Sequence, residues 1–462
     1  MSNSNDIKRL RHSTGHLYVK PFVALFISLL MPLISVFVFV LLTIHSVSAD
    51  QYHYNSVLIG NRASGLSGAY VAVADDPSGL FYNPSGIVYS ASTNVTANMN
   101  AFRYGRTKYV AALKTATGKN VDWIRTTSAL VPSFFGITQP LGPGTVGFSY
   151  AITDSVLENQ GQTFYDIRQA GTAYTINFNN QDTTNNVGPS YAIAIGDKLS
   201  IGLTMYGYFR NKERIFNQIY QLAGDGQVND ATPAVEQPPF FIANQYFSLD
   251  EYGVKPIFGI SYTPLNKLSL GFTFTQTFLF KSDTSVQYSE AGNICNDATQ
   301  TFQERCPNSS PTSFLLSREA STERRIFPWQ VNLGAAYFHS NKLLLTSSVW
   351  VYEAINLTSK PLINVAGGLE YYITGKIAVR MGAYTNMSNT PELVENAINV
   401  FNEHIDIVGA TMSLTHFTRS SAISIGGAGT YGKGKAQITG STNIQDVEYL
   451  GLSIFLSASN SF

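Results

Sequence analysis

Two cysteines are the residues whose spacing most directly offers chemistry. Cys295 and Cys306 lie eleven residues apart in a polar stretch that is rich in asparagine. Such a pair can form a disulfide that closes a loop, or it can contribute thiolates to a metal site. No histidine lies near the pair, and the histidines after residue 49 show no metal-ligand spacing: His53, His339, His404 and His416. We therefore predict a disulfide between the two cysteines, and no metal site.

One arginine could bind a carboxylate. Arg380 occurs in the segment Ile377 to Tyr384, where apolar residues alternate with small or polar ones, and it shares the phase of the small residues. A guanidinium offers paired N–H donors that match the two oxygens of a carboxylate. The carboxylate could belong to a ligand, or to Asp75 or Asp76 of the chain itself. Both readings remain open at this stage.

Enzyme chemistry is not indicated. Gly427 to Gly432 matches the glycine spacing of dinucleotide-binding loops, but it ends an alternating segment and no helix pattern follows it. No Gly-x-Ser-x-Gly occurs, and no grouping of histidine, serine and an acidic residue stands out. We predict neither an enzyme nor a cofactor.

The first 49 residues resemble an export signal. Four basic residues precede a run of 24 uncharged residues, Pro21 to Ile44, and Val47-Ser48-Ala49 offers small residues at the positions that signal peptidase reads. We predict residues 1–49 to be a signal peptide that is cleaved after Ala49. Because the run is long enough to span a bilayer as a helix, an uncleaved anchor is the alternative.

The remaining chain is poor in charge. Residues 50–462 contain 26 basic and 29 acidic residues, which gives no basic surface for a nucleic-acid partner. Charged residues make up 13% of the whole chain, against about 25% in an ordinary soluble domain. No second apolar stretch of helix-spanning length follows the signal, so strands that face lipid are the remaining explanation.

Apolar and small or polar residues alternate in many segments. Leu450, Leu452, Ile454 and Leu456 share one phase, while glycine and serine dominate the other. The same alternation occurs in the segments 199–206, 268–281 and 377–384. A period of two residues indicates strands with two different faces.

Segment and loop lengths indicate a membrane barrel. Several alternating segments run 10–15 residues, and a tilted membrane strand needs roughly 9–11. Tight turns are predicted at 196–198, 263–267, 339–342 and 374–376, and long polar loops at 158–185, 213–250, 284–324 and 388–402. Short turns at one end and long loops at the other are typical of outer-membrane barrels. We predict an all-β fold, a transmembrane antiparallel barrel of about fourteen strands over residues 92–462, with both ends in the periplasm.

Residues 50–91 break the alternation. Small residues dominate from Gly60 to Ala74, and an Asp-Asp-Pro sequence and an Asn-Pro sequence follow them. Some forty residues cannot easily form a core of their own. A compact hatch, or plug, inside the barrel lumen is therefore predicted for this segment, and a small periplasmic domain is the alternative.

These features resemble the FadL family of outer-membrane transporters for hydrophobic compounds, including the TodX-like channels. Tyr82-Asn83-Pro84-Ser85-Gly86 is similar to the family's Asn-Pro-Ala-Gly hatch motif, with serine in place of alanine. Further similar segments are 188–202, 259–271 and 379–391. The resemblance covers nearly the whole chain after the signal, but its individual motifs are short.

The resemblance implies passive uptake of long-chain fatty acids or other hydrophobic molecules. The ligand would be captured by the outer loops, enter the lumen, shift the hatch and leave sideways into the membrane. The residues expected to contact ligand are Arg380, Phe240, Phe241, Phe247, Phe314 and Leu315, although the loop residues could instead pack the loops together. Hatch positions are expected at Gly65, Gly68, Asp75, Asp76, Asn83 and Pro84.

The expected surroundings are lipid and lipopolysaccharide of the bacterial outer membrane, and the expected state is a monomer. Some relatives of the family bind secreted proteins instead of transporting solutes, as the PorV-like proteins do. A binding platform of that kind is the alternative function. The sequence does not indicate which hydrophobic molecule is carried.

Overall fold

A computed structural model describes residues 53, 57–90, 92–115, 117–167, 171–222, 240–292, 313–354, 360–397, 399, 403–437 and 443–462. All of them belong to one compact unit, Val47–Phe462. The predicted signal peptide and the predicted Cys295–Cys306 disulfide lie outside the described residues. In the described part of the chain, no helix has the length and apolar character needed to cross a membrane.

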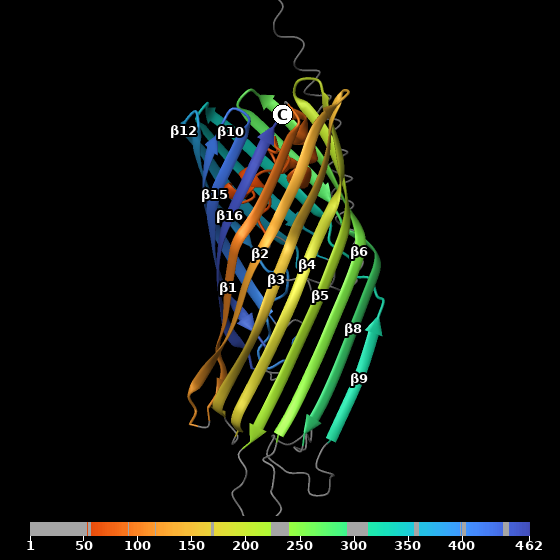
Figure 1. Cartoon of the computed structure of the whole chain (residues 1–462), viewed down its shortest axis with the longest axis vertical. Helices are drawn as coiled ribbons and strands as arrows, with labels where there is room; N and C mark the ends of the chain where they lie inside the picture. Colours follow the sequence, from red (N-terminus) through yellow and green to blue (C-terminus); the bar gives the residue numbers. More distant parts are fainter. Residues whose placement is uncertain are drawn as a thin grey trace, which may run out of the picture. The chain divides into compact units, whose positions relative to one another are not determined.

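The alternating segments form sixteen strands of one antiparallel sheet (Figure 1). Their bounds are β1 (Asn94–Lys114), β2 (Asn120–Leu141), β3 (Gly144–Ile167), β4 (Gly171–Ile195), β5 (Leu199–Leu222), β6 (Phe240–Leu265), β7 (Leu268–Thr275), β8 (Phe278–Gly292), β9 (Ser313–Ser321), β10 (Gln330–Ser340), β11 (Leu343–Tyr352), β12 (Leu362–Thr374), β13 (Ile377–Asn386), β14 (Glu403–Phe417), β15 (Ser421–Ala436) and β16 (Gln445–Ser461).

The sheet closes into a barrel of fourteen strand positions. β1 pairs with β16, and β5 pairs with β6, so the order of strands returns on itself. β7 and β8 both pair with β6, one after the other along its length, so together they occupy one strand position. β10 pairs with β7 and β9 pairs with β8, so β9 and β10 together occupy the next position. Closure leaves few backbone groups without a ladder partner, which a lipid environment requires. The predicted fold and strand count are confirmed.

The two phases of each strand face opposite sides of the barrel wall. On β16, Leu452, Ile454 and Leu456 are exposed, while Phe455 and Ser457 are buried on the opposite face. Most exposed large side chains of the other strands follow the same rule, and they form an apolar outer surface. The apolar phase of the sequence therefore points outward, as predicted.

Short turns join the strands at one end of the barrel, and all four predicted turns are found there. The prediction of long loops was wrong for three of the four. Residues 158–167 and 171–185 continue β3 and β4, residues 213–222 and 240–250 continue β5 and β6, and most described residues of 284–324 belong to β8 and β9. The described residues of 388–402 contain no strand, as predicted.

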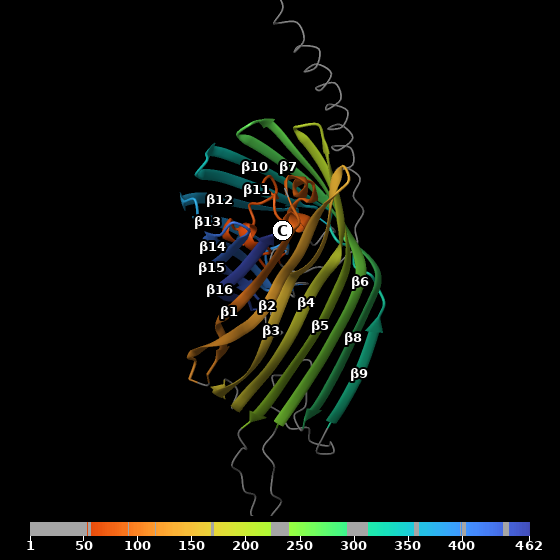
Figure 2. The same cartoon turned by 45° about the horizontal axis from the view of Figure 1, so that its top comes forward.

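The strand extensions build a tall wall on one side of the barrel (Figures 1 and 2). β3 to β6 contain 24 to 26 residues each, more than twice what a membrane crossing needs. β10 to β13 contain only 10 to 13 residues. We call the two ends of the barrel the short-turn end and the wall end.

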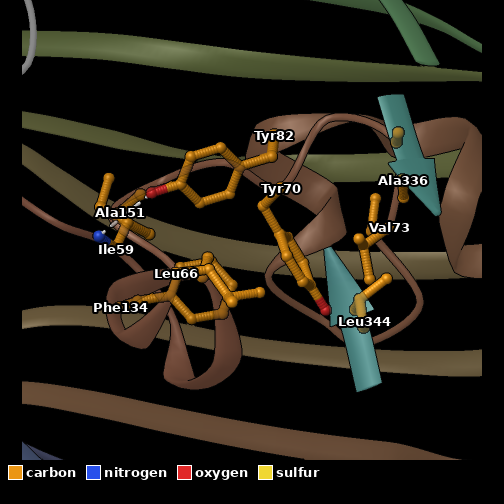
Figure 3. Packing of buried hydrophobic residues seen from close by; sticks show 12 residues of the cluster. Ile59, Leu66, Tyr70, Val73, Tyr82, Phe134, Ala151, Ala336 and Leu344 are labelled. Carbon is orange, nitrogen blue, oxygen red and sulfur yellow. Dashed lines mark hydrogen bonds between the residues drawn. The ribbon is translucent and has the colours of Figure 1, made fainter. Parts of the chain in front are cut away.

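Residues 57–90, here called the inner segment, fold into short helices: α2 (Asn61–Gly65), α3 (Gly79–Tyr82) and the 3-10 helix η1 (Pro84–Tyr89). Their core includes Leu66, Tyr70 and Tyr82, whose two tyrosine rings meet edge to face at 5.8 Å between centroids (Figure 3). The strands contribute the rest of this core, including Phe134 and Leu344. The inner segment therefore depends on the barrel for its folding.

Candidate ligand-binding site

The inner segment is held by inward-facing hydroxyl groups from strands all round the barrel. Thr204 of β5 donates to the carbonyl oxygen of Leu80 at 2.8 Å, Thr346 of β11 to Ala69 at 2.9 Å, and Thr411 of β14 to Gly65 at 3.0 Å. Ser200, Ser269 and Asn98 donate to further carbonyl groups of the segment. A segment that receives bonds from opposite sides of a closed barrel lies inside it.

Paired glycines on neighbouring strands make room for this segment. Gly271 of β7 and Gly334 of β10 are register partners, and a Cβ added to either would lie 2.6 Å from the Val71 carbonyl carbon or 2.8 Å from the Ala72 nitrogen. The pair Gly202 and Gly259 lies under residues 83–85 in the same way, and the pair Gly368 and Gly382 lies under residues 66–67. Only glycine permits such a close approach of two backbones.

Asn83 fixes one end of the inner segment. Its side-chain NH₂ group donates to the carbonyl oxygens of Val71 at 2.8 Å and Ile260 at 3.2 Å, while its Oδ1 accepts the Ser85 backbone N–H at 3.2 Å. Pro84 follows as the first residue of η1, where the missing N–H costs no hydrogen bond. Both residues thus have the structural role of turn residues in this segment.

A buried ion network ties the inner segment to the wall near the short-turn end. Arg62 binds Asp75 at 2.7 Å and Glu370 of β12 at 2.8 Å. Glu370 also accepts from Nε of Arg380 at 2.5 Å, and Arg380 donates to Thr415 as well. Arg380 is 2% exposed. Arg380 thus points inward, as its phase predicts, but its ionic partner is Glu370 instead of Asp75 or Asp76; Oδ1 of Asp76 accepts the Ser78 backbone N–H at 2.7 Å.

A cavity of about 490 Å³ lies between the inner segment and the wall end. His53, Val57 and Leu58 line it on one side. Aromatic side chains of the wall line it on the other: Tyr109, Trp123, Phe178, Phe216 and Tyr449. Charged side chains, among them Glu158, Asp182 and Lys212, also line the cavity. Its volume and the aromatic part of its lining suit a small apolar ligand.

Arg125 stands at the centre of the aromatic wall. Its guanidinium lies 4.4 Å from the Phe178 ring centroid, and it binds Glu158 at 2.6 Å and the Tyr109 hydroxyl at 2.6 Å. Tyr109 and Trp123 stack with centroids 5.0 Å apart. The arginine thus has a carboxylate and a hydroxyl partner within the wall and contacts the aromatic rings, while its Nε has no hydrogen-bond partner among the described residues.

A smaller cavity of about 120 Å³ lies nearer the inner segment and shares His53 and Asp154 with the larger one. Lys255 of β6 points into it, and its Nζ lies 5.3 Å from the Phe81 ring centroid. In the described part of the chain, no carboxylate pairs with this ammonium group. Lys255 is therefore a cation inside the barrel that a ligand anion could neutralise.

The barrel wall is interrupted beside the larger cavity. β2 and β3 pair from Phe134 to Leu141 on β2, and then only at Thr127, opposite Glu158. Between these positions, residues 128–133 and 152–157 form no ladder with each other. Thr127, Asp154 and Val156 at this break line the larger cavity. Pro132 has no N–H to offer to a ladder, which favours the interruption.

No family model matches the sequence, and no curated protein matches it. Three solved structures resemble the chain over nearly their whole length. A FadL homologue of Pseudomonas aeruginosa is 12% identical with a TM-score of 0.56, covering 91% of this chain and 100% of its own. The toluene transporter TodX of P. putida is 11% identical with a TM-score of 0.59, covering 89% and 99%. The toluene transporter TbuX of Ralstonia pickettii is 9% identical with a TM-score of 0.52, covering 87% and 98%.

The chain has the FadL/TodX outer-membrane barrel fold. At these identities the likeness concerns the fold, and two of the three similar structures are named as toluene transporters. The described residues also contain no group of three or more side chains suited to hold a metal ion.

The aromatic residues predicted to capture ligand lie on the extended wall of this FadL/TodX fold, not in loops. Phe240, Phe241 and Phe247 belong to β6, and the Phe247 ring lies 5.4 Å from the Arg214 guanidinium, which lines the larger cavity. Phe314 and Leu315 belong to β9, and the structure describes only the backbone of these two residues. β8 lies between β9 and β6 in the sheet. The structure thus brings the two groups to the same wall.

Two candidate ligand contacts were missed by the sequence analysis. Trp123 and Lys255 belong to segments whose alternation is weak, because polar residues occupy both phases. The alternation still indicates which way Lys255 points, because Lys255 has the same phase as the buried residues Ile257, Gly259 and Ser261. Like Arg380, Lys255 is a cation on the inward phase of a barrel strand, and this position predicts a side chain that faces the lumen.

Proposed function

We propose that this chain is a passive channel that carries small hydrophobic molecules across the bacterial outer membrane. The observation that carries the proposal is the aromatic cavity inside the barrel, which adjoins the break between β2 and β3. The similar structures named as toluene transporters and as a FadL homologue support the same class of solute. The short-turn end would face the periplasm and the extended wall the exterior.

In this proposal an apolar solute reaches the aromatic cavity and leaves through the break into the membrane. Backbone groups in a wall that faces lipid need partners, so an interruption is tolerated only where it adjoins a cavity or is bridged. Side chains bridge part of this one: Thr127 donates to the Leu157 carbonyl oxygen at 2.7 Å, and Gln160 accepts the Thr126 backbone N–H at 2.8 Å. A path sideways therefore needs few bonds to be broken.

The inner segment would act as the gate. It contacts both cavities through Val57 and Leu58, so a bound ligand can favour one position of the segment over another. Binding shifts such an equilibrium only through unequal affinity for the two positions. Sliding of the segment would require the Arg62 ion pairs to exchange.

Uptake into vesicles tests the proposal. Vesicles that contain the protein should take up toluene and oleate several-fold faster than vesicles without protein, because the solute crosses within the barrel. A matched preparation with another folded barrel serves as control. Rates equal to that control for both solutes would reject the channel and leave the alternative of a binding platform for secreted proteins.

Lys255 is the proposed partner for the carboxylate of a fatty acid. Lys255→Met keeps the length of the side chain and removes its charge. We expect oleate uptake to fall about tenfold, since a charged hydrogen bond contributes about 1.5–3 kcal/mol, while toluene uptake changes little. Lys255→Arg should retain most of the oleate uptake. Equal losses for the two solutes in Lys255→Met would remove this role.

Arg380, the cation predicted from the sequence to bind the carboxylate, is compared in the same assay. Its guanidinium is occupied by Glu370 and Thr415. We expect Arg380→Ala to change oleate and toluene uptake to the same extent, through the position of the inner segment. A selective loss of oleate uptake would restore the carboxylate role.

A further inference from the structure

The barrel wall has a second interruption, between the β7–β8 line and the β9–β10 line. β8 pairs with β9 down to Thr284, opposite Ser321, and β7 pairs with β10 from Thr275, opposite Gln330. In the described part of the chain, residues 276–283 and 322–329 form no ladder with each other. In Figure 1, β9 accordingly lies beside β8 near the wall end, while Figure 2 shows β10 beside β7 near the short-turn end.

The inner side of this interruption opens on the smaller cavity. Gln276 and Thr277 from one line, and Phe327 and Pro328 from the other, all line it. The side chain of Thr277 is buried, at 8% exposure. The interruption is therefore adjacent to an interior space, the smaller cavity, which shares Asp154 of the β2–β3 break with the larger one.

The outer side of the interruption is apolar. Phe278, Phe280 and Ile326 are 51%, 62% and 45% exposed. Next along β8, Lys281 and Asp283 form an exposed ion pair at 2.7 Å. A change from exposed aromatic rings to an exposed ion pair marks the edge of an apolar belt. The interruption thus lies where the apolar layer of a membrane meets its polar surface.

Side chains hold residues 322–329 across the interruption. Gln276 donates from Nε2 to the Phe327 carbonyl oxygen at 3.2 Å. Arg325 binds Glu251 of β6 at 2.6 Å and lies 4.2 Å from the Phe327 ring centroid. Pro328 cannot donate a backbone hydrogen bond to a continued ladder. Residues 322–329, which we call the strap, are thus held by side-chain contacts and by two hydrogen bonds between Trp329 and Glu353, and not by a strand ladder.

We propose that this interruption is an entrance through which uncharged apolar small molecules pass from the outer edge of the membrane's apolar layer into the smaller cavity. The inference rests on the proposed channel function and adds an entry site to it. At the interruption itself an uncharged molecule fits best, because Lys281 and Arg325 already have carboxylate partners. The cation Lys255 lines the cavity beyond the interruption. The molecules would then leave the larger cavity through the β2–β3 break.

A graded series at Thr277 tests the entrance. Thr277→Val, Thr277→Leu and Thr277→Phe place increasing volume at its inner end, in a protein that is otherwise complete. Toluene uptake into vesicles should remain near wild type for valine, which has nearly the size of threonine, and should fall several-fold for phenylalanine. Leucine should give an intermediate rate, and it keeps the test available if the phenylalanine variant does not fold.

Arg325→Met tests the opposite change, because it removes the ion pair with Glu251 that anchors the strap. We expect toluene uptake to rise in this variant. Toluene uptake at the wild-type rate in folded leucine and phenylalanine variants would overturn the entrance while leaving the channel intact. A wild-type protein that takes up neither toluene nor oleate would instead reject the channel itself.

Discussion

Replacing Gly271 by valine is expected to displace the inner segment and raise the ion conductance of the barrel several-fold. A Cβ at this position would lie 2.6 Å from the carbonyl carbon of Val71 and 2.9 Å from the Cα atom of Ala72. Both are backbone atoms of the inner segment, so no side-chain rotation can relieve the overlap. Overpacking costs about 1–3 kcal/mol even where side chains can adjust. Conductance across planar bilayers measures the result.

Two further variants make this prediction specific. Gly334→Val should act like Gly271→Val, because its Cβ would lie 2.8 Å from the Ala72 nitrogen. Gly429→Val should leave the conductance unchanged, since no atom lies within 4 Å of a Cβ added there. Resistance to unfolding by sodium dodecyl sulfate checks that each barrel is folded. A folded Gly271→Val barrel with wild-type conductance would mean that the inner segment does not obstruct the lumen.

The sequence analysis placed Gly271 in a segment similar to the family, but it did not predict that this glycine makes room for the inner segment. Gly271 lies among alternating residues and looks like any small residue of the inward phase. Its partner Gly334 is 63 positions away, and Val71 is 200 positions away in the other direction. Docking between such distant segments has no local pattern. The same is true of Glu370, whose contact with Arg62 joins residues 308 positions apart.

The full length of the strands could also not be predicted from the alternation of apolar and polar residues. β7 and β13 alternate strictly because one face meets an apolar surrounding and the other an enclosed interior. The outer half of β4 keeps its buried residues Tyr174, Ile176 and Phe178, but polar residues fill the positions between them. Beyond the apolar belt the outer face no longer needs apolar side chains. The pattern there looks like a polar loop, although hydrogen bonding continues.

Replacing Glu370 by glutamine is expected to destabilise the inner segment by about 3 kcal/mol, the lower end for removing one partner of a buried ion pair. Glu370 is fully buried and accepts bonds from Arg62 at 2.8 Å and from Arg380. Glutamine keeps the shape and one acceptor, but it leaves Arg62 with Asp75 as its carboxylate partner and removes the carboxylate that Arg380 binds. Cleavage by trypsin after Arg62 measures the loosening, because this residue lines a cavity at the short-turn end.

Two comparisons separate this network from ordinary ion pairs. Asp283→Asn breaks the exposed pair with Lys281 and should leave the stability nearly unchanged, because water screens that pair. The double variant Arg62→Gln/Glu370→Gln has no trypsin site at position 62, so it and both single variants are compared by resistance to denaturation. It should lose less stability than the two single variants added together, since removing both members leaves less charge unpaired. If Glu370→Gln proves no more sensitive to trypsin than Asp283→Asn, the network does not hold the inner segment. In the described part of the chain, Arg62 joins the segment's Asp75 to the wall's Glu370, so in that case the other contacts of the segment with the wall would control its gating movement.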